Sequence, residues 1–219
     1  MALIVFEGID GSGKSTQFSR LCAYFDQVEK AYTRLRFPQY DKPSSALLRM
    51  YLEGTFGLDP DDVNPYAAST FYAVDRYEAY KTVWGEAYHA GGCVLADRYT
   101  TSNAVHQGAK LEAEKQEGFF RWLEDFEHEK MELPRPDIVL YLDVPVEVSL
   151  KNIRARQEQT GAKADIHEAG AAYLHKCAAT AQAAAQFFSW HKISCTENGQ
   201  MRLEEDIHQE ILGLLREIL

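Results

Sequence analysis

The feature that most restricts the fold of this chain is a glycine-rich segment close to its start. Residues 8–15 read Gly-Ile-Asp-Gly-Ser-Gly-Lys-Ser and match the pattern GxxxxGK[ST]. The apolar run at residues 3–6 predicts a buried strand before this segment. Apolar residues at steps of three and four predict an amphipathic helix after it: Phe18, Leu21, Cys22, Phe25 and Val28. A strand, a tight turn and a helix in this order form a phosphate-binding loop (P-loop), in which backbone N–H groups and the helix N-terminus bind phosphate oxygens.

The side chains of this loop suit a nucleoside triphosphate. We expect Lys14 to bridge the β and γ phosphates of ATP and the Ser15 hydroxyl to ligate Mg²⁺, the ion that neutralises charge along the triphosphate. A glycine turn that only joins a strand to a helix does not explain why Lys and Ser follow one another. The residues expected to bind the donor nucleotide are Gly8, Asp10, Gly11, Ser12, Gly13, Lys14, Ser15 and Thr16.

Short apolar runs recur along the chain and alternate with helical patterns. Further runs of strand length lie at residues 33–37, 93–96, 138–142 and 192–195, and helical patterns lie at 66–90, 112–131, 169–185 and 203–218. Strands separated by long helices pair in parallel through right-handed crossovers. We therefore predict an α/β fold, a doubly wound three-layer α/β/α sandwich with a five-stranded parallel sheet, in one domain of residues 1–219. The polar segment 157–165 predicts an exposed loop between two helices.

Composition and charge narrow the function. The chain has 23 Lys and Arg against 33 Asp and Glu, a net charge of −10, which argues against nucleic acid as a partner. Residues 3–6 are too few for a signal-peptide core or a membrane span, so we expect a cytoplasmic protein. The four cysteines form no CxxC pair and the histidines have no ligand spacing, so we do not expect a metal held by protein ligands alone.

Three polar clusters stand where ligands gather in such folds, near the carboxyl ends of strands. Asp97-Arg98-Tyr99 follows the run 93–96, and Arg36-Phe37-Pro38-Gln39-Tyr40 follows the run that begins at 33. Tyr72 and Arg76 are four residues apart and share a face of one helix. Each cluster alone has an ordinary interpretation as a surface pair, a proline turn or a solvated arginine. The NKxD tetrapeptide typical of GTPases does not occur in the sequence.

Together with the P-loop, these clusters resemble the thymidylate kinase family, which transfers a phosphoryl group from ATP to dTMP. The likeness covers nearly the whole chain in the expected order. It extends from Phe6-Glu7-Gly8 through Arg36-Phe37-Pro38, the Asp97-Arg98-Tyr99 triplet with Ser102-Asn103 and the segment 140–145 to Arg154-Ala155-Arg156. The Asp-Arg-Tyr triplet is the most family-specific of these motifs.

The resemblance implies a role for each matching residue. Arg98 and Tyr40 would hold the acceptor phosphate, Arg36 and Phe37 would shape that wall, and Asp10 would bind the sugar 3′-hydroxyl or organise Mg²⁺. Arg76 would donate to thymine O4, Asn103 would pair with N3–H, and Tyr72 would stack on the base. The full set of substrate residues is Asp10, Arg36, Phe37, Tyr40, Tyr72, Arg76, Arg98, Ser102, Asn103 and His106.

The resemblance also implies how catalysis is divided. Asp97 would hold metal-bound water, so Ser15 and Asp97 form the metal site. A mobile lid at about 154–167, which contains Lys163, would bring Arg154 or Arg156 to the transferring phosphoryl group. The family places this cation in the P-loop or in the lid, and Gly11 resembles the lid type. The catalytic set is Lys14, Arg98, Arg154, Arg156, Asp97 and Asp10. A homodimer is also implied.

Two positions depart from the commonest family pattern. Tyr72 replaces a phenylalanine, with Phe71 beside it as an alternative stacking residue, and His106 replaces a tyrosine or phenylalanine near the ribose 2′ position. Because an imidazole is smaller and can form hydrogen bonds, we expect weaker exclusion of ribonucleotides.

Alternative functions remain open at this point. They are a kinase of deoxynucleosides, a kinase of another pyrimidine nucleotide such as UMP, and a non-catalytic nucleotide-binding dimer. The aromatic stripe Tyr77, Tyr80, Trp84 and Tyr88 suits either a core or a dimer contact.

Overall fold

A sheet of five parallel strands forms the centre of the protein in a computed structural model, which describes residues 1–160, 171–216 and 218. The strand order is β2-β3-β1-β4-β5. Their bounds are β1 (Ala2–Glu7), β2 (Thr33–Arg36), β3 (Cys93–Asp97), β4 (Ile138–Asp143) and β5 (His191–Ser194). All five predicted strands are confirmed. β1 pairs with both β3 and β4, so the strand before the P-loop lies in the middle of the sheet.

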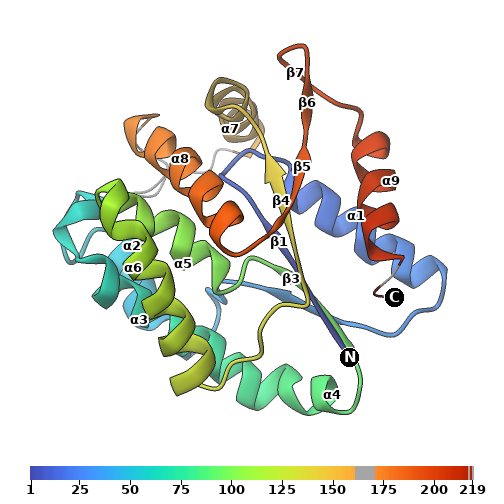
Figure 1. Ribbon diagram of the computed structural model, residues 1–219, viewed down its shortest axis with the longest axis horizontal. Helices are drawn as coiled ribbons and strands as arrows, with labels where there is room; N and C mark the ends of the chain where they lie inside the picture. Colours follow the sequence, from blue (N-terminus) through green and yellow to red (C-terminus); the bar gives the residue numbers. More distant parts are fainter. Residues whose placement is uncertain (161–170, 217, 219) are drawn as a thin grey trace.

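Helices cover both faces of this sheet (Figure 1). Helices α1 and α9 lie on one face, and most of the others lie on the opposite face. The α-helices are α1 (Lys14–Gln27), α2 (Ala46–Leu52), α3 (Pro65–Ala79), α4 (Gly85–His89), α5 (Thr101–His106), α6 (Ala113–Leu123), α7 (Val146–Thr160), α8 (Ala171–Phe187) and α9 (Glu204–Leu215). Shorter elements are the 3₁₀ turns η1 (Pro43–Ser45), η2 (Pro60–Asp62) and η4 (Gly108–Lys110), the π-helical segments η3 (Tyr80–Trp84) and η5 (Glu124–Lys130), and the hairpin β6 (Thr196–Glu197) and β7 (Gln200–Met201).

Alternate residues of β1 enter two different cores. Ile4 and Phe6 pack with apolar residues of α1 and α9, whereas Leu3 and Val5 pack with Trp84 and its neighbours on the other face. A strand that is buried on both faces needs apolar residues at every position, which explains the uninterrupted run at 3–6. The predicted three-layer α/β/α sandwich is thus confirmed.

The predicted loop at 157–165 is wrong over its first part, because α7 continues through residue 160. Residues 157–160 are Gln, Glu, Gln and Thr, and the first three favour helix without any apolar periodicity. Residues 161–165 lie outside the described part of the chain, as do residues 161–167 of the expected lid.

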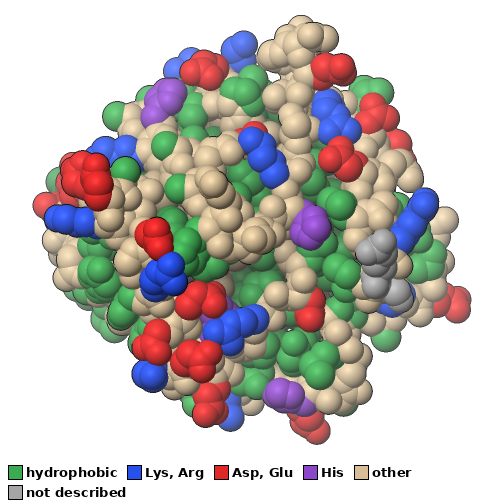
Figure 2. All heavy atoms as spheres, viewed as in Figure 1, with side chains coloured by type: hydrophobic (Ala, Val, Ile, Leu, Met, Phe, Trp, Pro, Cys, Tyr) green, Lys and Arg blue, Asp and Glu red, His purple; other side chains and the backbone are tan. Residues whose placement is uncertain are grey.

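The two longest predicted helices contain wider turns. η3 interrupts the segment 66–90 and η5 ends the segment 112–131. Of the aromatic stripe, Trp84 and Tyr88 lie in the core, and Tyr77 is exposed. Over the described residues, no helix combines the length and hydrophobicity that crossing a membrane requires. On the face drawn in Figure 2, Lys and Arg side chains are scattered among Asp and Glu side chains.

The contact between β1 and α1 should be important for stability. Phe18 is fully buried and its ring meets that of Phe6 edge to face, with centroids 5.7 Å apart. We expect Phe18→Ala to lower the free energy of unfolding by about 3–5 kcal/mol, because it leaves a cavity between helix and sheet. Chemical denaturation measures this change. Leu58→Ala is the control, since Leu58 is 83% exposed, and should change stability by less than about 0.5 kcal/mol. Equal effects of the two substitutions would contradict the prediction.

Candidate active site

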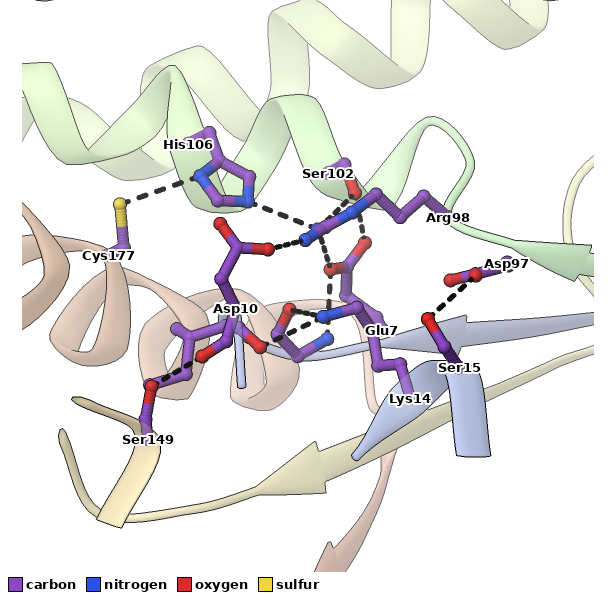
Figure 3. Close-up of polar contacts among 12 residues, drawn as sticks. Glu7, Asp10, Lys14, Ser15, Asp97, Arg98, Ser102, His106, Ser149 and Cys177 are labelled. Atoms are coloured by element: carbon purple, nitrogen blue, oxygen red, sulfur yellow. Dashed lines mark hydrogen bonds and ion pairs between the residues drawn. The ribbon is translucent and has the colours of Figure 1, made fainter. Parts of the chain in front are cut away.

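The P-loop lines a cavity at the carboxyl edge of the sheet, between β1 and α1. We call it the P-loop cavity. Its lining includes residues 10–17. It also includes Arg36 at the end of β2, Asp97 at the end of β3, and Asn152 and Arg156 of α7. Helix α1 begins at Lys14, and the first N–H groups of a helix have no carbonyl partner within it. The Lys14 ammonium donates to the carbonyl oxygens of Gly8 (2.7 Å) and Ile9 (2.9 Å) (Figure 3).

The protonation of Lys14 changes close to neutral pH. Its pKa falls from an ordinary 10.5 to about 8, first because the ammonium group is buried and second because the positive charge of Arg98 is near. The carboxylates of Asp10 and Glu7 act in the opposite direction but do not compensate. An anionic ligand in the cavity would favour the protonated form of Lys14 and raise its pKa again.

Arg98 is the centre of the polar network in Figure 3. It follows β3 with a left-handed backbone, φ 70°, and its guanidinium contacts Asp10 (2.5 Å), Glu7 (3.2 Å) and the Ser102 hydroxyl (3.2 Å). His106 Nε2 lies 3.1 Å from Arg98 Nη1, and because a guanidinium can only donate, Nε2 accepts this hydrogen bond. The His106 proton is therefore on Nδ1, which is 3.7 Å from the sulfur of Cys177.

Charge pairing governs the protonation of this network. Burial by itself would raise the pKa of Asp10, but the positive charges of Arg98 and Lys14 outweigh it and hold that pKa well below its ordinary value. Burial likewise opposes the charge of Arg98, yet Asp10 and Glu7 raise the pKa of its guanidinium. Asp10 and Arg98 are therefore both charged at neutral pH.

Glu7 was not among the predicted site residues, although it orients several of them. Its carboxylate is fully buried; one oxygen accepts from the Gly8 amide (2.9 Å) and Arg98, and the other from the hydroxyls of Thr101 (2.6 Å) and Ser102 (2.6 Å). A buried charge requires such partners. An acidic residue that ends an apolar strand was the signal available in the sequence.

A second cavity adjoins the P-loop cavity. Its lining is Asp10, Phe37, Pro38, Tyr40, Leu52, Tyr72, Arg76, Arg98, Tyr99, Ser102, Asn103 and His106. This set contains every predicted substrate residue except Arg36, which lines the P-loop cavity. Asp10, Phe37, Pro38, Tyr40 and Arg98 line both cavities, so the two spaces share one wall. Tyr72 lines the second cavity, whereas the ring of Phe71 packs against Tyr51 and Phe56.

Arg76 and Asn103 line the second cavity, and we call this pair its floor. Both residues bind Glu127, which was not among the predicted site residues. Arg76 Nε and Nη2 each donate to the Glu127 carboxylate at 2.7 Å, and Asn103 Nδ2 donates to it at 2.9 Å. Glu127 lies in η5, whereas Arg76 is in α3 and Asn103 in α5. No local pattern in the sequence signals a partner 51 residues away from Arg76.

Oxygen ligands gather where β3 ends beside α1. The Ser15 hydroxyl lies 3.5 Å from Asp97 Oδ2, and the same oxygen accepts from Arg36 Nε at 3.0 Å. A hydroxyl and a carboxylate are ligands that Mg²⁺ prefers. Within the described ranges, no group of three or more His, Cys, Asp or Glu side chains could hold a metal ion.

One face of α7 is docked on the P-loop. Ser149 donates to the Asp10 carbonyl, and Asn152 Nδ2 donates to the Gly11 carbonyl at 2.8 Å. Arg156 follows at the next helical step on this face and lines the P-loop cavity. Arg154 and Arg156 are both exposed, but Arg154 does not line this cavity. Lys163 of the expected lid lies outside the described residues.

Gly11 is a point of close approach between the P-loop and α7. Its backbone is left-handed, φ 74°, and a Cβ there would lie 2.5 Å from the Ser149 carbonyl oxygen. Any larger residue at this position would displace α7. The docking of this helix thus explains in physical terms why the loop carries glycine here.

The sheet order and the P-loop place this chain among the P-loop nucleotide-binding proteins, and the two adjoining cavities leave room for two ligands. The family model for thymidylate kinase matches residues 6–211 of this chain. The chain therefore belongs to the thymidylate kinase family, and it is a nucleoside monophosphate kinase.

Individual relatives agree with this assignment. A thymidylate kinase of Mycobacterium tuberculosis is 32% identical over 187 residues, which cover 84% of this chain and 86% of the relative. A thymidylate kinase of Prochlorococcus marinus is 26% identical over 218 residues, 97% of both chains. A probable thymidylate kinase of Pyrococcus horikoshii is 32% identical over 154 residues, 70% of both chains.

Binding of MgATP should be coupled to proton uptake by Lys14. With a pKa of about 8, this lysine is largely neutral at about pH 8.5 and becomes charged when the triphosphate raises its pKa. We expect uptake of ~0.7 proton at about pH 8.5 and ~0.1 at about pH 7. Calorimetric titration in two buffers of different ionisation enthalpy measures both values.

The control for this experiment is Lys110→Met. Burial also lowers the pKa of Lys110 to about 8, but this residue lines neither cavity. The variant should show the same proton uptake as the unmodified protein. Uptake that is absent at about pH 8.5, or that disappears with Lys110→Met, would refute the assignment to Lys14.

Proposed function

We propose that this protein transfers the γ-phosphoryl group of ATP to dTMP and so produces dTDP and ADP. The observation that carries this proposal is the wall shared by the two cavities, where Asp10 and Arg98 face both. Two nucleotides bound head to head would bring their phosphates together at this wall. Family membership favours a monophosphate over a deoxynucleoside as the acceptor.

On the donor side, Lys14 would exchange its two carbonyl contacts for the β and γ phosphates. Ser15 and Asp97 would hold Mg²⁺, directly or through water, and their adjacent oxygens fit that ion. The metal would neutralise charge on the phosphates as the γ-phosphoryl group leaves.

On the acceptor side, the phosphate of dTMP is already an ionised nucleophile, so no general base is required. Arg98 and Tyr40 would hold this phosphate, and Arg98 needs no rearrangement because Glu7 already fixes its guanidinium. Asp10 would orient Arg98 and meet the sugar 3′-hydroxyl or the hydrated metal. Catalysis then consists of positioning and of charge stabilisation in a preorganised site.

Base recognition would take place at the floor of the second cavity. Tyr72 would stack on the ring, while Arg76 and Asn103 would bind its edge. His106 would lie near the sugar, held there by Arg98 and Cys177. Weaker exclusion of ribonucleotides by this imidazole stays a prediction.

We also propose that the protein acts as a homodimer through α3. Val74 and Tyr77 lie one helical step apart and are 52% and 40% exposed. Two large apolar side chains on one exposed helix face favour contact with a second copy.

A coupled assay of ADP release tests the reaction and the choice of acceptor together. We expect turnover with dTMP to exceed that with dUMP, UMP, CMP, AMP and GMP, and no turnover with thymidine. The ratio of dUMP to UMP reports on His106. ADP release with thymidine alone would indicate a deoxynucleoside kinase, and no ADP release with any acceptor would indicate a non-catalytic protein.

Arg156 and Arg154 should behave differently when substituted. Arg156 would reach the transferring phosphoryl group from the docked face of α7, so Arg156→Ala should lower kcat by about a thousandfold with little change in KM. Arg154→Ala is the matched control, with the same change two residues away, and should stay within about threefold of the unmodified enzyme. Steady-state kinetics decide the matter: equal losses, or near-normal turnover of Arg156→Ala, would refute the role of Arg156.

A further inference from the structure

Glu127 is a buried carboxylate that lines neither cavity but binds two residues of the second one. Its side chain is 0% exposed, and its carboxylate accepts hydrogen bonds from Arg76 and Asn103. We propose that Glu127 is a positioning residue that determines base specificity. By fixing the hydrogen-bonding pattern of the cavity floor, it selects a 4-keto pyrimidine over cytosine. This inference rests on the proposed function.

The direction of the Asn103 amide follows from its two partners. Asn103 Nδ2 donates to the Ser69 carbonyl at 3.2 Å and to Glu127 Oε1 at 2.9 Å. A backbone carbonyl and a carboxylate can only accept, so the group that faces them must be the amide nitrogen. Turning the amide round would set oxygen against oxygen at both contacts. The Asn103 oxygen therefore remains as an acceptor for a ligand in the second cavity.

The guanidinium of Arg76 is fixed by the same carboxylate. Nε and Nη2 donate to Glu127, and Nη1 donates to the Tyr99 carbonyl at 3.3 Å. A guanidinium has five N–H groups, so one on Nη1 and one on Nη2 are left. Because Arg76 is buried together with Glu127, the two charges cancel and this floor is electrically neutral. The remaining N–H groups of Arg76 can bind a carbonyl oxygen of the ligand.

The floor therefore offers a ligand two donors, the remaining N–H groups of Arg76, beside one acceptor, the side-chain oxygen of Asn103. A 4-keto pyrimidine offers the complement, with O4 as an acceptor and N3–H as a donor. Cytosine offers the reverse, with an amino group at position 4 and a lone pair at N3. Both contacts would then fail, and buried polar groups without partners are costly. Because Glu127 holds both protein groups, it determines the choice without touching the base.

The test is Glu127→Gln, with the ratio of kcat/KM for dTMP to that for dCMP as the readout. In this variant one acceptor oxygen becomes an NH₂ group, so the three N–H groups that converge on Glu127 can no longer all be accepted. We expect the ratio to fall at least tenfold. A purely structural role would lower thermal stability and leave the ratio unchanged, and that result in folded protein would overturn the inference.

Two further variants make the experiment decisive. Glu124→Gln is the matched control, because it removes a carboxylate from the same segment, is partly exposed and pairs with Arg135 instead of the cavity floor. It should keep the ratio of the unmodified enzyme. If Glu127→Gln does not fold, Glu127→Asp retains the charge that pairs with Arg76 but is too short to hold both partners. It should also lower the ratio, and an unchanged ratio would overturn the inference.

The outcome is separable from that of the proposed function. If the unmodified enzyme does not phosphorylate dTMP, the proposed function fails. If it does and prefers dTMP to dCMP, but Glu127→Gln and Glu127→Asp both preserve that preference, only the role of Glu127 fails.

Discussion

The buried carboxylate of Glu7 is the contact on which the rest of the site depends. It accepts hydrogen bonds from the Gly8 amide, from Arg98 and from the hydroxyls of Thr101 and Ser102. One charge thereby joins the P-loop, the end of β3 and the start of α5. A carboxylate this deeply buried is costly without a full set of donors, so these three elements stabilise one another through it. The spacing between the two cavities is consequently set by the centre of the sheet.

Two arginines, Arg98 half-buried and Arg76 buried, show how pairing with carboxylates can leave different groups available to a ligand. Arg98 is paired with Glu7 and Asp10 but stays partly accessible at the wall between the cavities, where a phosphate can approach it. Arg76 is closed off by Glu127 on one side and keeps only its outer N–H groups for a ligand. Ion pairs with these carboxylates thus hold both arginine side chains in place and keep them from turning toward solvent. Charge is available at the wall between the two cavities, and a neutral hydrogen-bonding surface is available in the second cavity.

Much of this could be predicted from local patterns. The P-loop and the five strands follow from runs of a few residues, and the motif order placed nearly all of the second cavity in advance. The sequence could not show whether Arg154 or Arg156 faces the P-loop, because a polar segment without apolar periodicity does not reveal which side of the helix is docked. The contacts of Ser149 and Asn152 with the P-loop identify that side. Glu127 could not be found, since a single acidic residue in a helix is usually on a solvated face.

By itself, the sequence determined the order of strands and helices, the P-loop motif of residues 8–15 and the family to which the chain belongs. These properties reside in short segments, where periodicity and side-chain type are sufficient information. The tertiary structure alone decided which cation of α7 faces the P-loop, how Glu7 holds Arg98 and how Glu127 directs Arg76 and Asn103. Each of these depends on burial and on partners distant in the chain, and the energy of a buried charge is defined only once its whole surroundings are assembled.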